Sequence, residues 1–310
     1  MSRYKNIIDW VHHIINFFDF KNRYVFNRET LWQIDFLLPN SRILFITILS
    51  KFKTNYIRTK NNSGRIESVA KIKKIDNLNN WQIHDMIASS ESCVNFETAI
   101  YNSMNVASRF GANSISVLSR STKLTEQLET LGFSKIQKSH LCYLQNYNLN
   151  KVNSTSKNVI RKKLPSDEYS MFQLYNSNKH QASAIVHTLN FEHWKSLVAG
   201  FNSGFEEFVV EEHGLLVCCF RIKFDANVVK IEILSYSSLN HDLIDSILKM
   251  ISSFNNRTIY LLISGEYTKV ESVLLESGLQ IVAEYDLSIK WLANFIDNRK
   301  NLKSRILNAG

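Results

Sequence analysis

The segment SYSSLNHDL, residues 235–243, joins an alternating run that predicts a strand to a pattern that predicts a helix. Its central residues are Ser237, Ser238, Leu239, Asn240 and His241. A helix N-terminus attracts anions because its first amides lack partners and its dipole is positive there. The histidine adds a cation when it is protonated. The serines and the asparagine also suit a simple N-cap, so the segment predicts either an anion site or a cap.

Three nearby side chains could carry acid–base chemistry. Glu232 alternates with Ile231 and Ile233, which puts its carboxylate on the face of the strand opposite to these isoleucines. Tyr236 follows the same strand, and Tyr267 begins the last predicted helix. A carboxylate can accept a proton and a phenol can donate one. The alternative is a solvent-facing glutamate and two buried core tyrosines.

Other reaction classes lack their sequence signals. The chain contains no HExxH, GxSxG or P-loop sequence and no His/Cys cluster with metal-ligand spacing. Its four cysteines, Cys93, Cys142, Cys218 and Cys219, form no CxxC pair, which predicts reduced thiols and a cytoplasmic location. No apolar run reaches the roughly 20 residues that span a bilayer. The amphipathic stretch 3–20 is interpreted as a first helix on the core.

The net charge of +9 is unevenly distributed. Residues 1–158 carry about +10 and the remainder about −1. Much of the excess lies in 51–74, whose alternation around Asn61–Gly64 predicts a β-hairpin. The lysine and arginine side chains of this hairpin suit either a strand face that is exposed to solvent or a surface that attracts a polyanion. Strict alternation puts Phe52 on the face opposite Lys51 and Lys53, which argues against nucleic-acid binding by stacking.

The two ends of the chain share one order of elements. The first half is predicted to begin with a strand at 43–49, the hairpin and a strand at 80–89. A helix at 95–112, a strand at 113–119, a helix at 122–132 and a final strand follow. A polar linker follows at 147–157, which separates predicted domains 1–146 and 158–310.

The second domain repeats the ending of the first. The repeated part is preceded by a strand at 158–164, a helix capped by Ser166, a helix at 190–201 and three strands over 207–236. That part is a helix at 240–254, a strand at 257–264, a helix at 266–278 and a last strand. LETLGF at 128–133 and LLESGL at 274–279 fall at matching points, which indicates an internal duplication.

This order resembles the GNAT acetyltransferase superfamily, in which a mixed sheet ends in strand, helix, strand, helix, strand and the last helix often closes on a GF turn. Gly132-Phe133 matches that turn, and Gly278-Leu279 is a weaker version. FQLYNSN and FEHWKSL look like paired helices of some tandem members. The resemblance implies an α+β fold of two tandem GNAT-like domains, each a mixed, mostly antiparallel sheet flanked by helices.

It further implies acyl transfer from acetyl-CoA or another acyl-CoA to a small-molecule or peptide amine, without a metal. Residues 237–241 would then bind the CoA diphosphate, Glu232 would be the general base and Tyr236 or Tyr267 the general acid. His84 and Asp85 are first-domain alternatives for the base.

Both domains depart from the family pattern. The loops 88–96 and 235–243 contain no glycine, and Glu91 would repel a diphosphate. Leu128 and Leu274 stand where active members commonly have a tyrosine. We therefore expect at most one working site, in the second domain. The alternative is an inactive tandem protein that binds or scaffolds.

Overall fold

The computed structural model describes residues 22–26, 32, 55–60, 66–75, 79–88, 96–120, 122–144, 158–177, 191, 194–195, 204–225, 227–251, 257–264, 272–274 and 276–292. The strands are β1 (Asn22–Phe26), β2 (Tyr56–Lys60), β3 (Ile66–Lys74), β4 (Asn80–Ala88), β5 (Ser114–Ser119), β6 (Ser134–Leu144), β7 (Val159–Lys162), β8 (Glu206–Glu212), β9 (Leu215–Phe224), β10 (Val228–Tyr236), β11 (Thr258–Ser264) and β12 (Gln280–Trp291). The helices are α3 (Phe96–Arg109), α4 (Thr122–Thr130), the 3₁₀ turn η2 (Pro165–Asp167), α5 (Glu168–Ser177) and α8 (His241–Ile251), and residues 272–274 and 276 are also helical.

All these strands belong to one mixed sheet in the order β2-β3-β4-β1-β5-β12-β6-β11-β10-β9-β8-β7. Two of its neighbouring pairs, β4–β5 and β10–β11, are parallel, and the other pairs are antiparallel. Each parallel pair is joined by one helix, α3 or α8, as a parallel connection requires. The α+β class and the mostly antiparallel sheet are confirmed, as are the repeated elements of the two halves.

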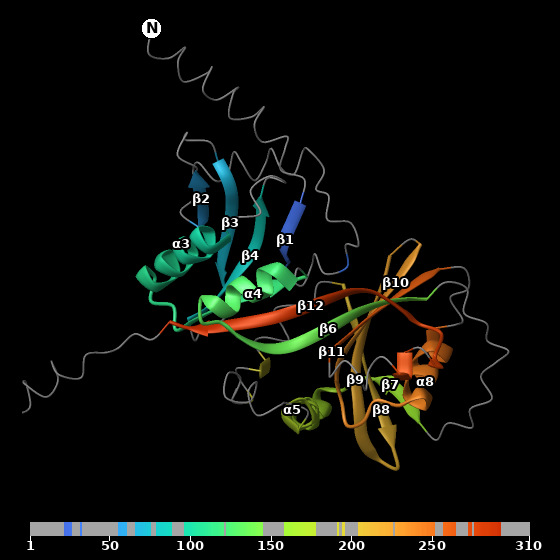
Figure 1. Ribbon diagram of the computed structural model, residues 1–310. Helices are drawn as coiled ribbons and strands as arrows, with labels where there is room; N and C mark the ends of the chain where they lie inside the picture. The colour runs from blue at the N-terminus through green and yellow to red at the C-terminus, as the bar shows by residue number, and fades with distance from the viewer. Residues whose placement is uncertain are drawn as a thin grey trace, which may run out of the picture.

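The two halves exchange their last strands (Figure 1). β12 ends the second half but lies between β5 and β6, whereas β6 ends the first half and pairs with β11. Cross-strand ion pairs join the exchanged strands, with Lys135 Nζ 2.6 Å from Asp286 Oδ1 and Lys138 Nζ 2.9 Å from Glu284 Oε2. The central strands are therefore shared between the halves. The linker at 147–157 lies outside the described residues, and the boundary placed there stays a prediction.

Both quoted glycine turns are C-terminal helix caps of one kind. Gly132 and Gly278 have φ values of 80° and 73°, a left-handed conformation that glycine adopts without a Cβ clash. The amide of the next residue donates to a carbonyl five residues back at 2.9 Å, from Phe133 to Leu128 and from Leu279 to Leu274. This bond and the contact between the apolar side chains are the marks of a Schellman cap. Leu128 and Leu274 are both 0% exposed, and each provides the apolar side chain that its cap requires.

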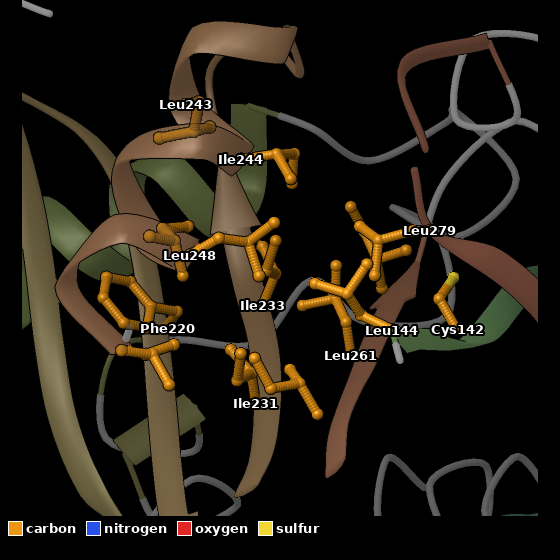
Figure 2. Close-up of a cluster of buried hydrophobic side chains, with 14 of the residues drawn as sticks. Cys142, Leu144, Phe220, Ile231, Ile233, Leu243, Ile244, Leu248, Leu261 and Leu279 are labelled. Carbon is orange, nitrogen blue, oxygen red and sulfur yellow. The ribbon is translucent and has the colours of Figure 1, made fainter. Parts of the chain in front are cut away.

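The second-half core packs α8 against the sheet (Figure 2). Leu243, Ile244 and Leu248 of the helix face Phe220, Ile231, Ile233 and Leu261 of the strands, as Figure 2 shows. Cys142 and Leu144 of β6 belong to the same cluster, so the first half contributes to this core. Burial raises the pKa of the Cys142 thiol to about 12, which keeps it protonated and unreactive.

Because side chains alternate along β9, its neighbours face opposite sides of the sheet. Cys218 and Phe220 face α8, whereas Cys219 packs with Met171 and Leu174 of α5 on the other side. The second half of the sheet therefore lies between α8 and α5. In the first half, α3 and α4 share one cluster with residues of β3, β4 and β5.

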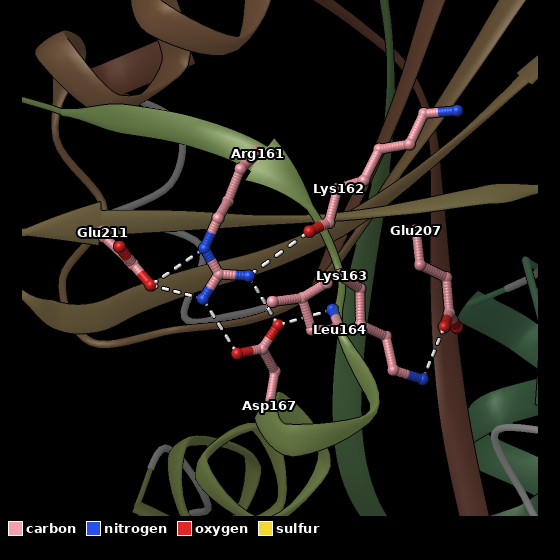
Figure 3. Close-up of polar contacts among 7 residues, drawn as sticks. All are labelled: Arg161, Lys162, Lys163, Leu164, Asp167, Glu207 and Glu211. Atoms are coloured by element: carbon pink, nitrogen blue, oxygen red, sulfur yellow. Dashed lines mark hydrogen bonds and ion pairs between the residues drawn. The ribbon is translucent and has the colours of Figure 1, made fainter.

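An ion-pair network fixes the start of α5 (Figure 3). Arg161 of β7 donates to both carboxylate oxygens of Asp167, at 2.6 and 2.8 Å, and also to Glu211 of β8. The Leu164 amide donates to Asp167 Oδ2 at 2.7 Å. These bonds, that from Arg161 above all, hold the pKa of Asp167 below its usual value. The prediction that Ser166 caps this helix is wrong, because Ser166 lies inside the 3₁₀ turn η2 and Leu164 is the N-cap residue.

Several predicted elements lie outside the described residues. They are the first helix at 3–20, the strand at 43–49, most of the helix at 190–201 and the start of the helix at 266–278. The basic hairpin is confirmed for β2 and β3, which pair antiparallel from Tyr56↔Lys71 to Lys60↔Ile66. Lys71 Nζ lies 5.7 Å from the Tyr56 ring centroid.

Candidate functional site

The parallel strands β10 and β11 pair only along part of their length. They run in register from Val228↔Thr258 to Glu232↔Leu262, and both continue beyond that point, to Tyr236 and to Ser264. Within the part of the chain that the structure describes, no strand pairs with both of these extensions. The Tyr236 hydroxyl donates to the Ser264 carbonyl at 3.0 Å and so joins the two strand ends. We call this place the second opening: residues 233–236 of β10 and 263–264 of β11.

The start of α8 lies next to the second opening. Ser237 continues β10, because its amide donates to the Val217 carbonyl at 2.7 Å, and the helix begins four residues later. Ser237, Ser238 and Asn240 are exposed and Leu239 is half-buried against the core. Asn240 Oδ1 accepts the Leu243 amide at 2.8 Å, so Asn240 is an N-cap. The amides of His241 and Asp242 lie in the first helical turn, where amides have no partner within the helix and the helix dipole is positive.

Two charged groups lie at the start of α8. His241 Nδ1 lies 3.0 Å from Asp245 Oδ2, one helical turn along, so its ring is held beside the helix. Asp242 is exposed in the first turn and adds a negative charge. The groups that the start of α8 offers to an anion are therefore backbone amides and serine hydroxyl groups more than a cationic side chain.

Glu232 is held in a buried ion pair. Its Oε2 accepts Arg221 Nε at 2.9 Å and Nη2 at 2.6 Å, across the register pair Glu232↔Arg221 of β9 and β10. The side chains of Arg221 and Glu232 are 2% and 7% exposed. The Arg221 guanidinium stacks on Phe205, with Cζ 4.5 Å from the ring centroid. Glu232 thus lies where the pairing of β10 with β11 ends, and its carboxylate is neutralised by Arg221.

The candidate acid–base groups lie on different faces of the sheet. Tyr236 packs against the cluster that α8 covers, together with Ile231 and Ile233, whereas Glu232 alternates with these isoleucines and faces away. The structure therefore does not bring the two groups together: Tyr236 binds the Ser264 carbonyl and Glu232 binds Arg221. Tyr267 lies outside the described residues.

The first half contains a matching separation of two parallel strands, β4 and β5, which we call the first opening and which β1 occupies. β4 and β5 run parallel from Asn80↔Ser114 to Ile83↔Val117, and beyond these residues β1 pairs antiparallel with both strands. Val25 of β1 is 0% exposed and belongs to the first-half core. The predicted anion loop of this half, at 89–95, lies outside the described residues.

The described residues contain no group of three His, Cys, Asp or Glu side chains that could hold a metal ion. In the same part of the chain, no helix has the length and apolar character needed to cross a membrane. Free thiols are found at Cys142, Cys218 and Cys219.

The sequence interpretation missed Arg221 and Phe205. The sequence did contain a signal for Arg221. Arg221 interrupts the apolar run LLVCCFRI and Glu232 interrupts the run KIEILS, and a short turn joins these two runs. Charged residues inside two neighbouring buried strands predict a cross-strand pair. Nothing in the local sequence of Phe205 indicates the guanidinium above it.

Comparison with known proteins identifies the fold. No protein-family model matches the sequence, and no curated protein matches it either. Among solved structures, a GCN5-related N-acetyltransferase from Sphaerobacter thermophilus matches 79% of this chain and 84% of its own, with 11% identity and a TM-score of 0.50. A conserved protein of unknown function from Staphylococcus epidermidis matches 78% of this chain and 97% of its own, with 13% identity and a TM-score of 0.53. The chain has the fold of the GCN5-related N-acetyltransferase (GNAT) superfamily, in two GNAT-like halves.

Proposed function

We propose that the protein binds acetyl-CoA or a related acyl-CoA at the second opening and transfers the acyl group to an amine. The observation that carries this proposal is the junction of the opening with the start of α8. The parallel pairing of β10 and β11 ends at Glu232 and Leu262, where an extended chain would bind, and helical amides lie beside it for a diphosphate. The fold shared with a GCN5-related N-acetyltransferase supports the same reaction class.

The chain's residues would divide the work as follows. Backbone amides at 241–242 and the hydroxyl groups of Ser237 and Ser238 would bind the diphosphate. Tyr236 would exchange its bond to the Ser264 carbonyl for one to the thioester sulfur, and would protonate the departing CoA thiolate. The amine would attack as the free base, Glu232 would accept the proton that the amine loses, and Arg221 would keep the Glu232 carboxylate ionised until then. The acceptor would be a small-molecule or peptide amine.

A second function, binding without turnover, is favoured by one observation. Both leucines at the family's tyrosine positions, Leu128 and Leu274, are fully buried in helix caps and have no acid–base chemistry. Retained CoA binding, combined with no release of free CoA from acetyl-CoA in the presence of an amine panel, would identify this inactive form.

Calorimetric titration with acetyl-CoA and with CoA tests the binding proposal. We expect one nucleotide per chain, and we expect Ser238→Glu to weaken binding about tenfold, because a carboxylate a few ångströms from a diphosphate costs ~1 kcal/mol or more. Ser134→Glu is the matched control, since Ser134 is also exposed but begins β6. Equal affinity in both variants, or no heat with millimolar ligand, would refute the site.

A further inference from the structure

The first and second openings differ in one element. Each half has a parallel strand pair joined by a helix, and each pair separates after four or five paired residues on each strand. In the first half, β1 occupies the gap and pairs with Ile87 and Met86 on one side and with Ser119 and Leu118 on the other. No described strand does this in the second half, where only the Tyr236 side chain crosses.

Backbone chemistry explains why such a gap needs an occupant. When two parallel strands separate, the inward-facing amide and carbonyl groups of both lose their partners, and burying them unpaired is costly. A third extended chain restores both ladders at once. Val25 anchors that chain, because it is paired on both sides and its side chain is fully buried beside Met86 and Val117 in one core cluster.

We infer that the first opening is a binding site for an extended polypeptide and that the chain fills it with its own residues 22–26. β1 acts as an internal strand ligand, which closes this opening to other extended ligands; among the described residues, the second opening is left without such a strand. β1 lies far from its partners in sequence, 54 or more residues from β4, so it is added to the sheet by long-range docking. The inference depends only on strand pairing and does not rest on the proposed acyl transfer.

Residue-resolved hydrogen exchange on the full chain tests this inference. Val25→Ala is expected to speed exchange roughly tenfold or more at residues 22–26 and at those amides of 86–88 and 118–119 that point towards β1, whereas the amides that point towards β3 or β12 stay protected. The amides of 80–83 and 114–117, where β4 and β5 pair directly, should exchange as in the unchanged protein. Leu215→Ala is the control, since this exposed side chain lies on β9.

A stronger variant extends the test to binding in trans. Val25→Asp should expel β1, and a synthetic peptide of residues 20–28 should restore the protection of 86–88 and 118–119. The same peptide with Val25→Pro should not, because proline cannot donate to the ladder.

Uniform acceleration throughout β4 and β5 in Val25→Ala would overturn the inference, since it would make β1 an inseparable part of the sheet. Unchanged exchange at 86–88 would overturn it too.

Discussion

Glu232→Ala is expected to lower the free energy of unfolding by about 3–5 kcal/mol, because it leaves the Arg221 guanidinium buried without its charge partner. Arg221 is 2% exposed, so water cannot replace the lost carboxylate without opening the sheet. The Phe205 ring on which the guanidinium stacks gives no compensating charge. Chemical denaturation monitored by circular dichroism measures the loss.

The double variant Arg221→Met/Glu232→Leu is the control. Removing both charges should leave stability unchanged or raise it by about 1–4 kcal/mol, since neither group then remains buried alone. The same variant separates a structural glutamate from one that serves acyl transfer. A stable double variant that binds acetyl-CoA but no longer acylates amines would support a role for Glu232 with substrate. A double variant as unstable as Glu232→Ala would contradict the paired-charge account.

Phe220→Ala is expected to cost about 3–5 kcal/mol and to destabilise both halves together. Phe220 is 0% exposed and stacks on Phe208 with ring centroids 5.5 Å apart. Its cluster contains Cys142 and Leu144 of the exchanged strand β6, so loss of this core loosens a strand that also pairs with β12. Hydrogen exchange at β5 amides should therefore accelerate along with that at β9.

Leu215→Ala should change stability by less than about 0.5 kcal/mol, because Leu215 is 71% exposed. Two separate unfolding transitions in Phe220→Ala, with β5 protection intact, would show that the exchanged strands do not couple the halves.

Local signals in the sequence predicted the repeated elements well. The glycines at 132 and 278 mark helix ends because their left-handed conformation is required by the caps, and that requirement is written in a few neighbouring residues. Asn240 was one of several residues considered as a cap of this helix, and the structure shows that it accepts the capping bond. The exchange of β6 and β12 was not predicted, since strand alternation defines a buried face but not the neighbouring strand.

The candidate site residues stay a prediction, although the structure shows where they lie. Residues 237–240 lead into α8, which begins at His241 next to the end of β10. β1 was missed because five residues, NRYVF, are too few to establish a strand by alternation alone. The partner of Glu232 comes from another strand, and the sequence interpretation considered each strand by itself.

The most direct test of the account is a crystal structure of the protein with CoA. We predict the pantetheine arm between β10 and β11, with the diphosphate at the amides of 241–242 and β1 still paired with β4 and β5. CoA bound in the first opening in place of β1, or bound away from both openings, would contradict the account.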